Sequence, residues 1–131
     1  GPEVVKTVTH EEITAEELGG AITHTTRSGV ADLAFDTDVD ALLMLRRFFN
    51  YLPLSNRQKA PVRQTTDTAN RLEKSLDTLV PDNPNKPYDI KELIGKVVDE
   101  GDFFEISETF AKNIVTGFGR IAGRHAAQRN L

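Results

Sequence analysis

The most regular hydrophobic pattern of the chain lies between residues 37 and 52. Apolar side chains recur there at spacings of three and four, which is the period of an amphipathic α-helix. Thr37 or Asp36 can cap this helix, and Pro53 ends it. The apolar stripe consists of Val39, Leu42, Leu43, Leu45, Phe48, Phe49 and Leu52. Burial of one large apolar side chain is worth about 1.5–3 kcal/mol, so we expect this helix to be a principal anchor of the core.

Shorter patterns precede this helix. The proline at the second position suits the first turn of a helix, where its missing N–H costs nothing. Thr14 followed by Glu17 fits a capping box for a second helical turn. We expect Gly19 or Gly20 to end that turn in a left-handed conformation. The stretch 30–35 alternates loosely between apolar and polar residues and predicts a short strand.

The second half of the chain changes from helix to sheet. A short helix is predicted over 67–76, and Asp89 caps another that Gly101 ends. The runs 103–107 and 113–123 are rich in strand-forming residues, and the Ala-Gly pair that ends the second run predicts a hairpin turn. The sequence therefore predicts a mixed α and β chain.

Composition narrows the class of protein. With 131 residues, 38% apolar and 27% charged, the chain has the size of one ordinary domain. No apolar run approaches the roughly 20 residues of a membrane span, and a net charge of −4 disfavours a nucleic-acid partner. Without cysteine there is no disulfide, thiolate nucleophile or zinc-cysteine site, which favours the reducing cytoplasm. No secretory signal is visible in the first residues.

Several motif-like stretches have simpler explanations. The aspartates at 36–40 are spaced as in a calcium loop, but Ala41 and Arg47 stand where that loop needs glycine and glutamate, so helix capping is preferred. The stretch HEEIT begins at His10 like the helix of a zinc protease, but Thr14 stands where the second histidine ligand is needed, so a zinc site is not predicted. The run 117–123 resembles a dinucleotide loop, but its third glycine comes one place late, and a strand with a hairpin turn explains it better. Nothing places a nucleophile beside a histidine: His10, His24 or His125.

A basic and aromatic stretch, LRRFFNY, has two interpretations. Basic and aromatic residues together occur in proteins that stack on nucleic acid. On a helix, this spacing turns the phenylalanines inward and the arginines outward. We therefore interpret the stretch as part of a core helix.

The stretch 16–30, EELGGAITHTTRSGV, is the first place to look for chemistry. It combines adjacent glycines with threonines, a histidine, a serine and an arginine between more apolar runs. Functional residues lie on loops more often than on the elements that the loops connect. The alternative is a structural loop that only caps a helix and leads into a strand.

Three stretches together resemble one family. They are residues 1–56, 76–106 and 110–124, ending in the motif FAKNIVTGFGRIAGR. They are similar to the carboxyltransferase subunits of biotin-dependent acyl-CoA carboxylases, the family of propionyl-CoA carboxylase β chains and methylmalonyl-CoA carboxyltransferases. The resemblance covers residues 1 to about 124.

The resemblance implies an α/β fold of the crotonase-like carboxyltransferase type. Subunits of this family contain two crotonase-like halves, and active sites form between halves of different subunits in a hexamer. Residues 1–52 would end the first half, 53–88 would connect the halves, and 89–124 would begin the second. Residues 125–131 depart from the family pattern, so we expect a partial chain.

The family reaction moves the carboxyl group of carboxybiotin to propionyl-CoA and forms methylmalonyl-CoA. The biotin is carried by a partner, the biotin carboxylase or biotin carrier subunit. In this family, backbone N–H groups of glycine-rich turns hold the oxyanions. Neither turn can be matched onto this sequence, so we assign no catalytic residue and no metal, and we expect the chain to be inactive alone.

The resemblance gives the stretch 16–30 a role as part of the wall of the cleft for acyl-CoA and biotin. Glycines allow the backbone to approach a bulky ligand closely. The residues assigned to this wall are Gly19, Gly20, Thr23, His24, Ser28 and Gly29. The alternative from another class is a non-catalytic module that associates with intact carboxyltransferase subunits through the helix at 37–52.

Overall fold

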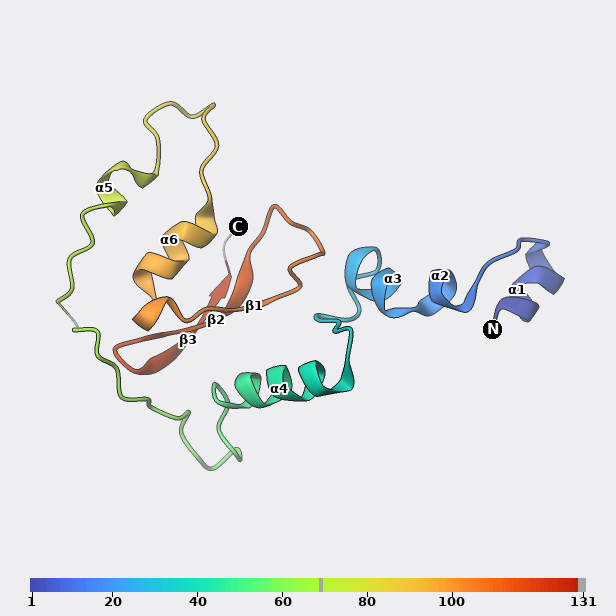
Figure 1. Ribbon diagram of the computed structural model, residues 1–131, viewed down its shortest axis with the longest axis horizontal. Coiled ribbons are helices and arrows are strands. Elements are labelled where there is room, and N and C mark those ends of the chain that lie inside the picture. The colour runs from blue at the N-terminus through green and yellow to red at the C-terminus, as the bar shows by residue number, and fades with distance from the viewer. Residues whose placement is uncertain (69, 130–131) are drawn as a thin grey trace.

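The computed structural model describes residues 1–68 and 70–129, with side chains described through Arg124 (Figure 1). The helices of the first half are α1 (Pro2–Thr9), α2 (Ala15–Gly19), α3 (Ala21–Thr26) and α4 (Asp38–Phe49). They are followed by α5 (Leu76–Leu79), α6 (Ile90–Val97) and the 3-10 turn η1 (Asp99–Gly101). The strands are β1 (Phe104–Ile106), β2 (Thr116–Ile121) and β3 (Arg124–Arg129).

The strands form one antiparallel sheet in the order β1-β2-β3. Phe104 of β1 is paired with Phe118 of β2, and a two-residue turn joins β2 to β3. Both turn residues, Ala122 and Gly123, have positive φ, of 52° and 74°. Two central residues with positive φ are typical of a type I′ hairpin turn. The predicted strands and hairpin are therefore confirmed.

The two faces of β2 contact different helices. Phe118 and Arg120 lie against the aromatic end of α4. Gly117 and Gly119 face the other side, where a Cβ on Gly119 would lie 2.5 Å from a methyl carbon of Val98, just after α6. The alternation follows from the two-residue period of a strand. Glycine on one face lets α6 and its following residues approach the sheet closely.

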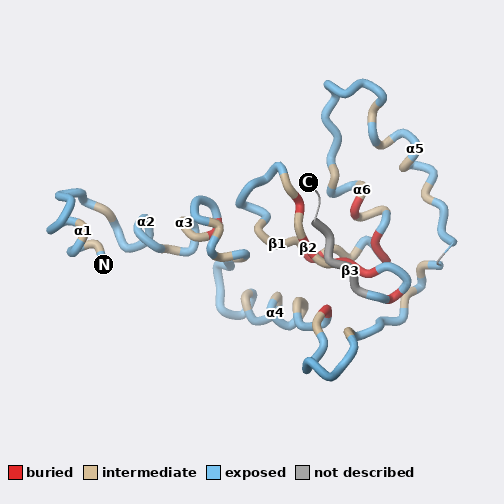
Figure 2. The backbone as a smooth tube through the Cα atoms, turned by 180° about the vertical axis from the view of Figure 1, so that it is seen from behind, coloured by how far each residue is buried: buried red, intermediate tan, exposed pale blue. Residues whose placement is uncertain are grey.

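The apolar core is small and is divided by the sheet. On the α6 side, a cluster is formed by Ile94, Val98 and Val115, with Ile90 and Phe103 packed against it. On the α4 side, the rings of Phe48, Tyr51, Phe104 and Phe118 pack with centroids 5.3–6.2 Å apart. Figure 2 shows buried residues concentrated around the sheet.

Helix α4 is capped as predicted, but it does not anchor the core along its length. Thr37 accepts a hydrogen bond from the backbone N–H of Asp40 at 3.1 Å. Phe48 packs on the sheet, whereas five other residues of the stripe are about half exposed or more: Val39, Leu42, Leu43, Leu45 and Phe49. The expectation that this helix is a principal anchor of the core therefore holds only for its aromatic end, because no described element packs against the other apolar residues (Figure 2). None of the described helices is long and apolar enough to cross a membrane.

Other helix boundaries were predicted from local signals. Helix α1 begins at the proline of position 2, and α2 carries the complete capping box of Thr14 and Glu17. Asp89 caps α6 by accepting a hydrogen bond from the backbone N–H of Lys91 at 2.8 Å. These three helix starts are confirmed. The predicted end of the Asp89-capped helix at Gly101 was wrong, because α6 already ends at Val97 and Val98 is extended. Gly101, with a φ of 66°, ends the separate 3-10 turn η1 instead.

Two predicted elements are absent from the described residues. The stretch 30–35 forms no strand, and Asp32 instead makes an isolated contact in which its carbonyl accepts from the N–H of Ser107 at 3.0 Å. No neighbouring strand supplies the ladder that a strand needs. The described part of 67–76, which excludes residue 69, is not helical before α5. The Asp67 carboxylate accepts from the distant N–H of Glu100 at 2.8 Å instead of capping a helix.

Candidate functional site

The stretch proposed from sequence as a loop is mostly helical. Gly20 has a φ of −77° and ψ of 174°, so the predicted left-handed stop was wrong. Its N–H donates to the carbonyl of Glu16 at 2.8 Å and closes α2, while its carbonyl accepts from the N–H of His24 at 3.1 Å and opens α3. One extended residue therefore separates two short helices.

The polar side chains of this segment bind mainly to the segment itself. The Thr23 hydroxyl donates to the carbonyls of Glu16 and Glu17, both at 3.1 Å. His24 Nδ1 and Ser28 Oγ lie 3.0 Å apart. The structure thus joins His24 to Ser28, and a Cβ on Gly19 would lie 3.4 Å from His24 Nε2.

Gly29 ends the segment at a contact with the loop before β2. Its φ is 64°, and a Cβ added there would lie 2.6 Å from the ring of Phe110. Nearby, the Thr109 hydroxyl donates to the carbonyl of Thr25 at 2.9 Å. Gly29 is therefore separated by a helix from Gly19 and Gly20. No group of three potential metal ligands gathers among the described residues, here or elsewhere.

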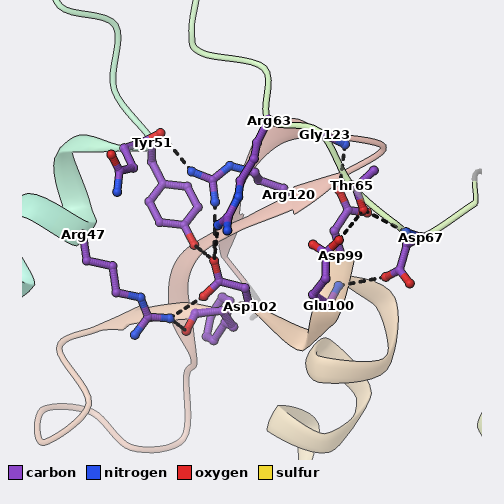
Figure 3. A network of polar contacts seen from close by, with 12 residues as sticks. Arg47, Tyr51, Arg63, Thr65, Asp67, Asp99, Glu100, Asp102, Arg120 and Gly123 are labelled. Atoms are coloured by element: carbon purple, nitrogen blue, oxygen red, sulfur yellow. Dashed lines mark hydrogen bonds and ion pairs between the residues drawn. The ribbon is translucent and has the colours of Figure 1, made fainter.

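A second polar cluster surrounds Asp102 and was not foreseen from the sequence. One carboxylate oxygen accepts from Arg47 of α4 at 2.5 Å. The other accepts from the Tyr51 hydroxyl at 3.1 Å and from Arg120 of β2 at 3.4 Å. Arg63, from the connection after α4, lies 3.8 Å away from the same oxygen. Figure 3 shows these side chains converging on the carboxylate.

Arg120 is the most enclosed of the three arginines, with 6% of its surface exposed. One terminal nitrogen donates to the carbonyl of Asn50 at 2.9 Å. Its guanidinium carbon lies 4.1 Å from the centre of the Tyr51 ring, within the range of a cation–π contact. The buried Nε has no hydrogen-bond partner.

Electrostatics hold this cluster in one charge state at neutral pH. Burial raises the pKa of Asp102, but the hydrogen bond and charge of Arg47 outweigh it, so the pKa lies below its usual value. Burial and the neighbouring Asp102 carboxylate raise the pKa of Tyr51. Asp102 is therefore ionised, and Tyr51 keeps the proton that it donates.

Hydrogen bonds hold the connection after α4 next to this cluster. Asp99 accepts from the N–H of Gly123 at 2.7 Å, which supports the hairpin turn. Glu100 accepts from the Thr65 hydroxyl at 2.7 Å, and Asp67 accepts from the N–H of Glu100. Between the connection, α4 and the sheet lies a hollow of about 310 Å³. Its lining comes from residues far apart in sequence, so no local motif marked it.

Comparisons with known proteins assign the chain to a family. Residues 1–127 match the carboxyl transferase domain. The chain is 65% identical over 124 residues to the propionyl-CoA carboxylase beta chain of Roseobacter denitrificans, and the match covers 95% of this chain and 24% of that relative. It is 59% identical over 124 residues to the mitochondrial propionyl-CoA carboxylase beta chain of Sus scrofa, and that match covers 95% of this chain and 23% of the relative.

A solved structure shows the same arrangement of elements. The transcarboxylase 12S core, described as a hexamer with methylmalonyl-coenzyme A bound, superimposes with a TM-score of 0.92 at 35% identity. The match covers 97% of this chain and 24% of that chain. The predicted crotonase-like carboxyltransferase fold is thereby confirmed for this portion. The chain spans about a quarter of the length of these relatives, and it belongs to the carboxyl transferase domain family.

Proposed function

We propose that this chain is part of the carboxyltransferase of a biotin-dependent acyl-CoA carboxylase. The whole enzyme would move a carboxyl group to propionyl-CoA and form methylmalonyl-CoA, with carboxybiotin supplying that group. The observation that carries the proposal is the 65% identity to a propionyl-CoA carboxylase beta chain over 95% of this chain. Because the chain spans a quarter of that relative, we propose that the isolated chain has no turnover.

A chimera tests the proposal directly. Residues 1–124 replace the matching quarter of the Roseobacter denitrificans beta chain, and methylmalonyl-CoA formation is measured with propionyl-CoA and the carboxylated biotin carrier. We expect the chimera to be active and the isolated chain to be inactive. A folded, assembled chimera without activity would contradict the proposed function, and turnover by the isolated chain would contradict its proposed inactivity.

We propose that the α2–α3 segment forms part of the acyl-CoA and biotin cleft in the whole enzyme. The residues concerned are Gly19, Gly20, Thr23, His24, Ser28 and Gly29. Support comes from the family resemblance and from the exposure of Gly19 and Ser28. A Cβ on Gly20 would lie 1.9 Å from the carboxyl carbon of Glu16. Since Glu16 is an exposed, flexible side chain, Gly20→Val can be accommodated by moving it.

Kinetics of the chimera test this assignment. Gly20→Val should raise the Michaelis constant for acyl-CoA or biotin because it adds bulk to the proposed wall and displaces the Glu16 side chain. His24→Ala should have a milder effect, reflecting one hydrogen bond of about 0.5–1.5 kcal/mol. If the segment only caps helices, both variants will change thermal stability and leave both Michaelis constants unchanged.

The organisation of the whole protein is part of the same proposal. Residues 1–52 would end the first half, 53–88 would connect the halves, and 89–124 would begin the second. Residues 125–131 would depart from the family pattern; 125–129 lie in β3, and 130–131 lie outside the described residues. The partners would be a biotin carboxylase or biotin carrier subunit and further carboxyltransferase subunits in a hexamer. The proposed compartment is the cytoplasm; the Sus scrofa relative, named as mitochondrial, represents the alternative.

A second candidate function is a non-catalytic module that associates with intact carboxyltransferase subunits. The observation that favours it is the exposed apolar side of α4, which includes Leu42 and Leu43 and borders a hollow of about 460 Å³. Co-purification with the Roseobacter denitrificans beta chain tests this function. Leu43→Glu should abolish association, while Leu72→Glu, at an exposed site in the connection, should retain it. Equal binding by both variants would exclude α4 as the contact.

A further inference from the structure

The hollow beside Asp102 has an excess of positive charge. Three guanidinium groups line it, from Arg47, Arg63 and Arg120, whereas the carboxylates in its lining are Asp102 and Glu100. Glu100 Oε1 is held by Thr65 and Thr66, with Thr65 Oγ1 donating to it at 2.7 Å and the N–H of Thr66 at 2.9 Å. Three guanidinium groups and two carboxylates give the lining a net charge of +1.

Arg63 is the guanidinium with the weakest partner. Asp102 already accepts from Arg47, Tyr51 and Arg120. The 3.8 Å from Arg63 to Asp102 is an ion-pair distance and is too long for a hydrogen bond. Because 66% of the Arg63 side chain is exposed, its planar set of donors can turn to another anion at the mouth of the hollow.

We propose that this hollow binds a phosphate group. A guanidinium matches two phosphate oxygens at once, and such charge-assisted pairs are stronger than neutral hydrogen bonds. The volume of about 310 Å³ lies at the lower end of small-molecule sites, which span roughly 300–1,000 Å³. This inference does not depend on the proposed carboxyltransferase function, because it rests on the charge and geometry of the hollow alone.

Calorimetric titration of the chain with pyrophosphate at low salt tests the proposal. Arg63→Gln should weaken binding about tenfold, the loss expected for one charge-assisted contact. Arg57→Gln is the matched control, because it removes an exposed arginine from the same connection but outside the lining of the hollow. Arg63→Lys should fall between wild type and Arg63→Gln, since it keeps the charge and loses the paired donors.

Further arms distinguish the source of the phosphate and guard against misfolding. Coenzyme A binding that is weakened by Arg63→Gln assigns the group to the coenzyme, whereas binding of pyrophosphate or inorganic phosphate alone assigns a smaller anion. Circular dichroism confirms that each variant keeps the wild-type fold. Absence of pyrophosphate binding to the wild-type chain, or equal affinity of the Gln variants at positions 57 and 63, would overturn the proposal.

Discussion

Tyr51→Phe removes one hydroxyl from a ring that is 1% exposed, and it leaves the ring in place. The hydroxyl donates to Asp102 at 3.1 Å. The raised pKa of Tyr51, caused first by burial and then by the Asp102 charge, means that the proton needed for this bond is present at neutral pH. The packing of Tyr51 with Phe104 and Phe118 should be unchanged.

The expected cost is that of one hydrogen bond to a charged acceptor. Such bonds contribute about 1.5–3 kcal/mol to stability. We expect about 1.5 kcal/mol, the lower end, because the Asp102 side chain is 29% exposed and water can replace the lost donor. Tyr51→Ala also removes the ring from Arg120, Phe104 and Phe118 and should cost about 3–5 kcal/mol.

Urea unfolding followed by circular dichroism measures both effects. With a slope of about 1–3 kcal/mol per molar urea, Tyr51→Phe should lower the midpoint by roughly 0.5–1.5 M without changing the slope. Tyr88→Phe is the control, because Tyr88 is about half exposed. If Tyr51→Phe and Tyr88→Phe have the same midpoint, the hydroxyl contributes nothing and the reasoning about Asp102 is refuted.

Three further predictions concern other contacts. Gly123→Ala should destabilise the chain by at least about 1 kcal/mol, because its φ is 74° and a Cβ would lie 2.2 Å from the carbonyl oxygen of Arg63. Gly95→Ala should stabilise α6, because no atom lies within 4 Å of a Cβ there. Urea midpoints that shift in the same direction for both variants would contradict this prediction. Thr14→Ala should destabilise α2 by about 1 kcal/mol through loss of its cap, measured as reduced helicity of residues 15–19 by NMR, and unchanged helicity would contradict it. Burial raises the pKa of Asp102, but Arg47 lowers it more, to below its ordinary 3.8, so its stabilisation is present above about pH 4 and is lost as the pH falls through the lower folded value. The stability difference between wild type and Asp102→Asn should therefore shrink on acidification, and a constant difference in urea midpoints from pH 7 to strongly acidic pH would contradict this assignment.

Local signals in the sequence predicted the helix starts and the hairpin. Thr14, Thr37 and Asp89 each cap a helix through a side chain that reaches a backbone N–H two or three residues ahead. The Ala-Gly pair before β3 predicted a turn because the conformation of a tight turn depends on the dihedral angles of its own central residues. The stretch 30–35 misled for the opposite reason, since a strand exists only where a partner strand accepts its hydrogen bonds.

The candidate site was also predictable only in part. The polar composition of the α2–α3 segment was visible in the sequence, but the helical conformation was not. Gly20 permits an extended residue as readily as a left-handed one, and the contacts on either side decide between them. The resemblance to a carboxyltransferase identified the family, because long runs of matching residues carry that information without any knowledge of contacts.

By itself, the sequence determined the family, the helix caps, the hairpin and the amphipathic pattern of α4. Tertiary structure alone decided that Arg47, Tyr51 and Arg120 meet at Asp102, and that one side of α4 stays exposed. The physical reason is the distance along the sequence between the groups that interact. Caps and turns are satisfied within a few residues, whereas a charge cluster or a buried face needs groups from distant positions that only folding brings together.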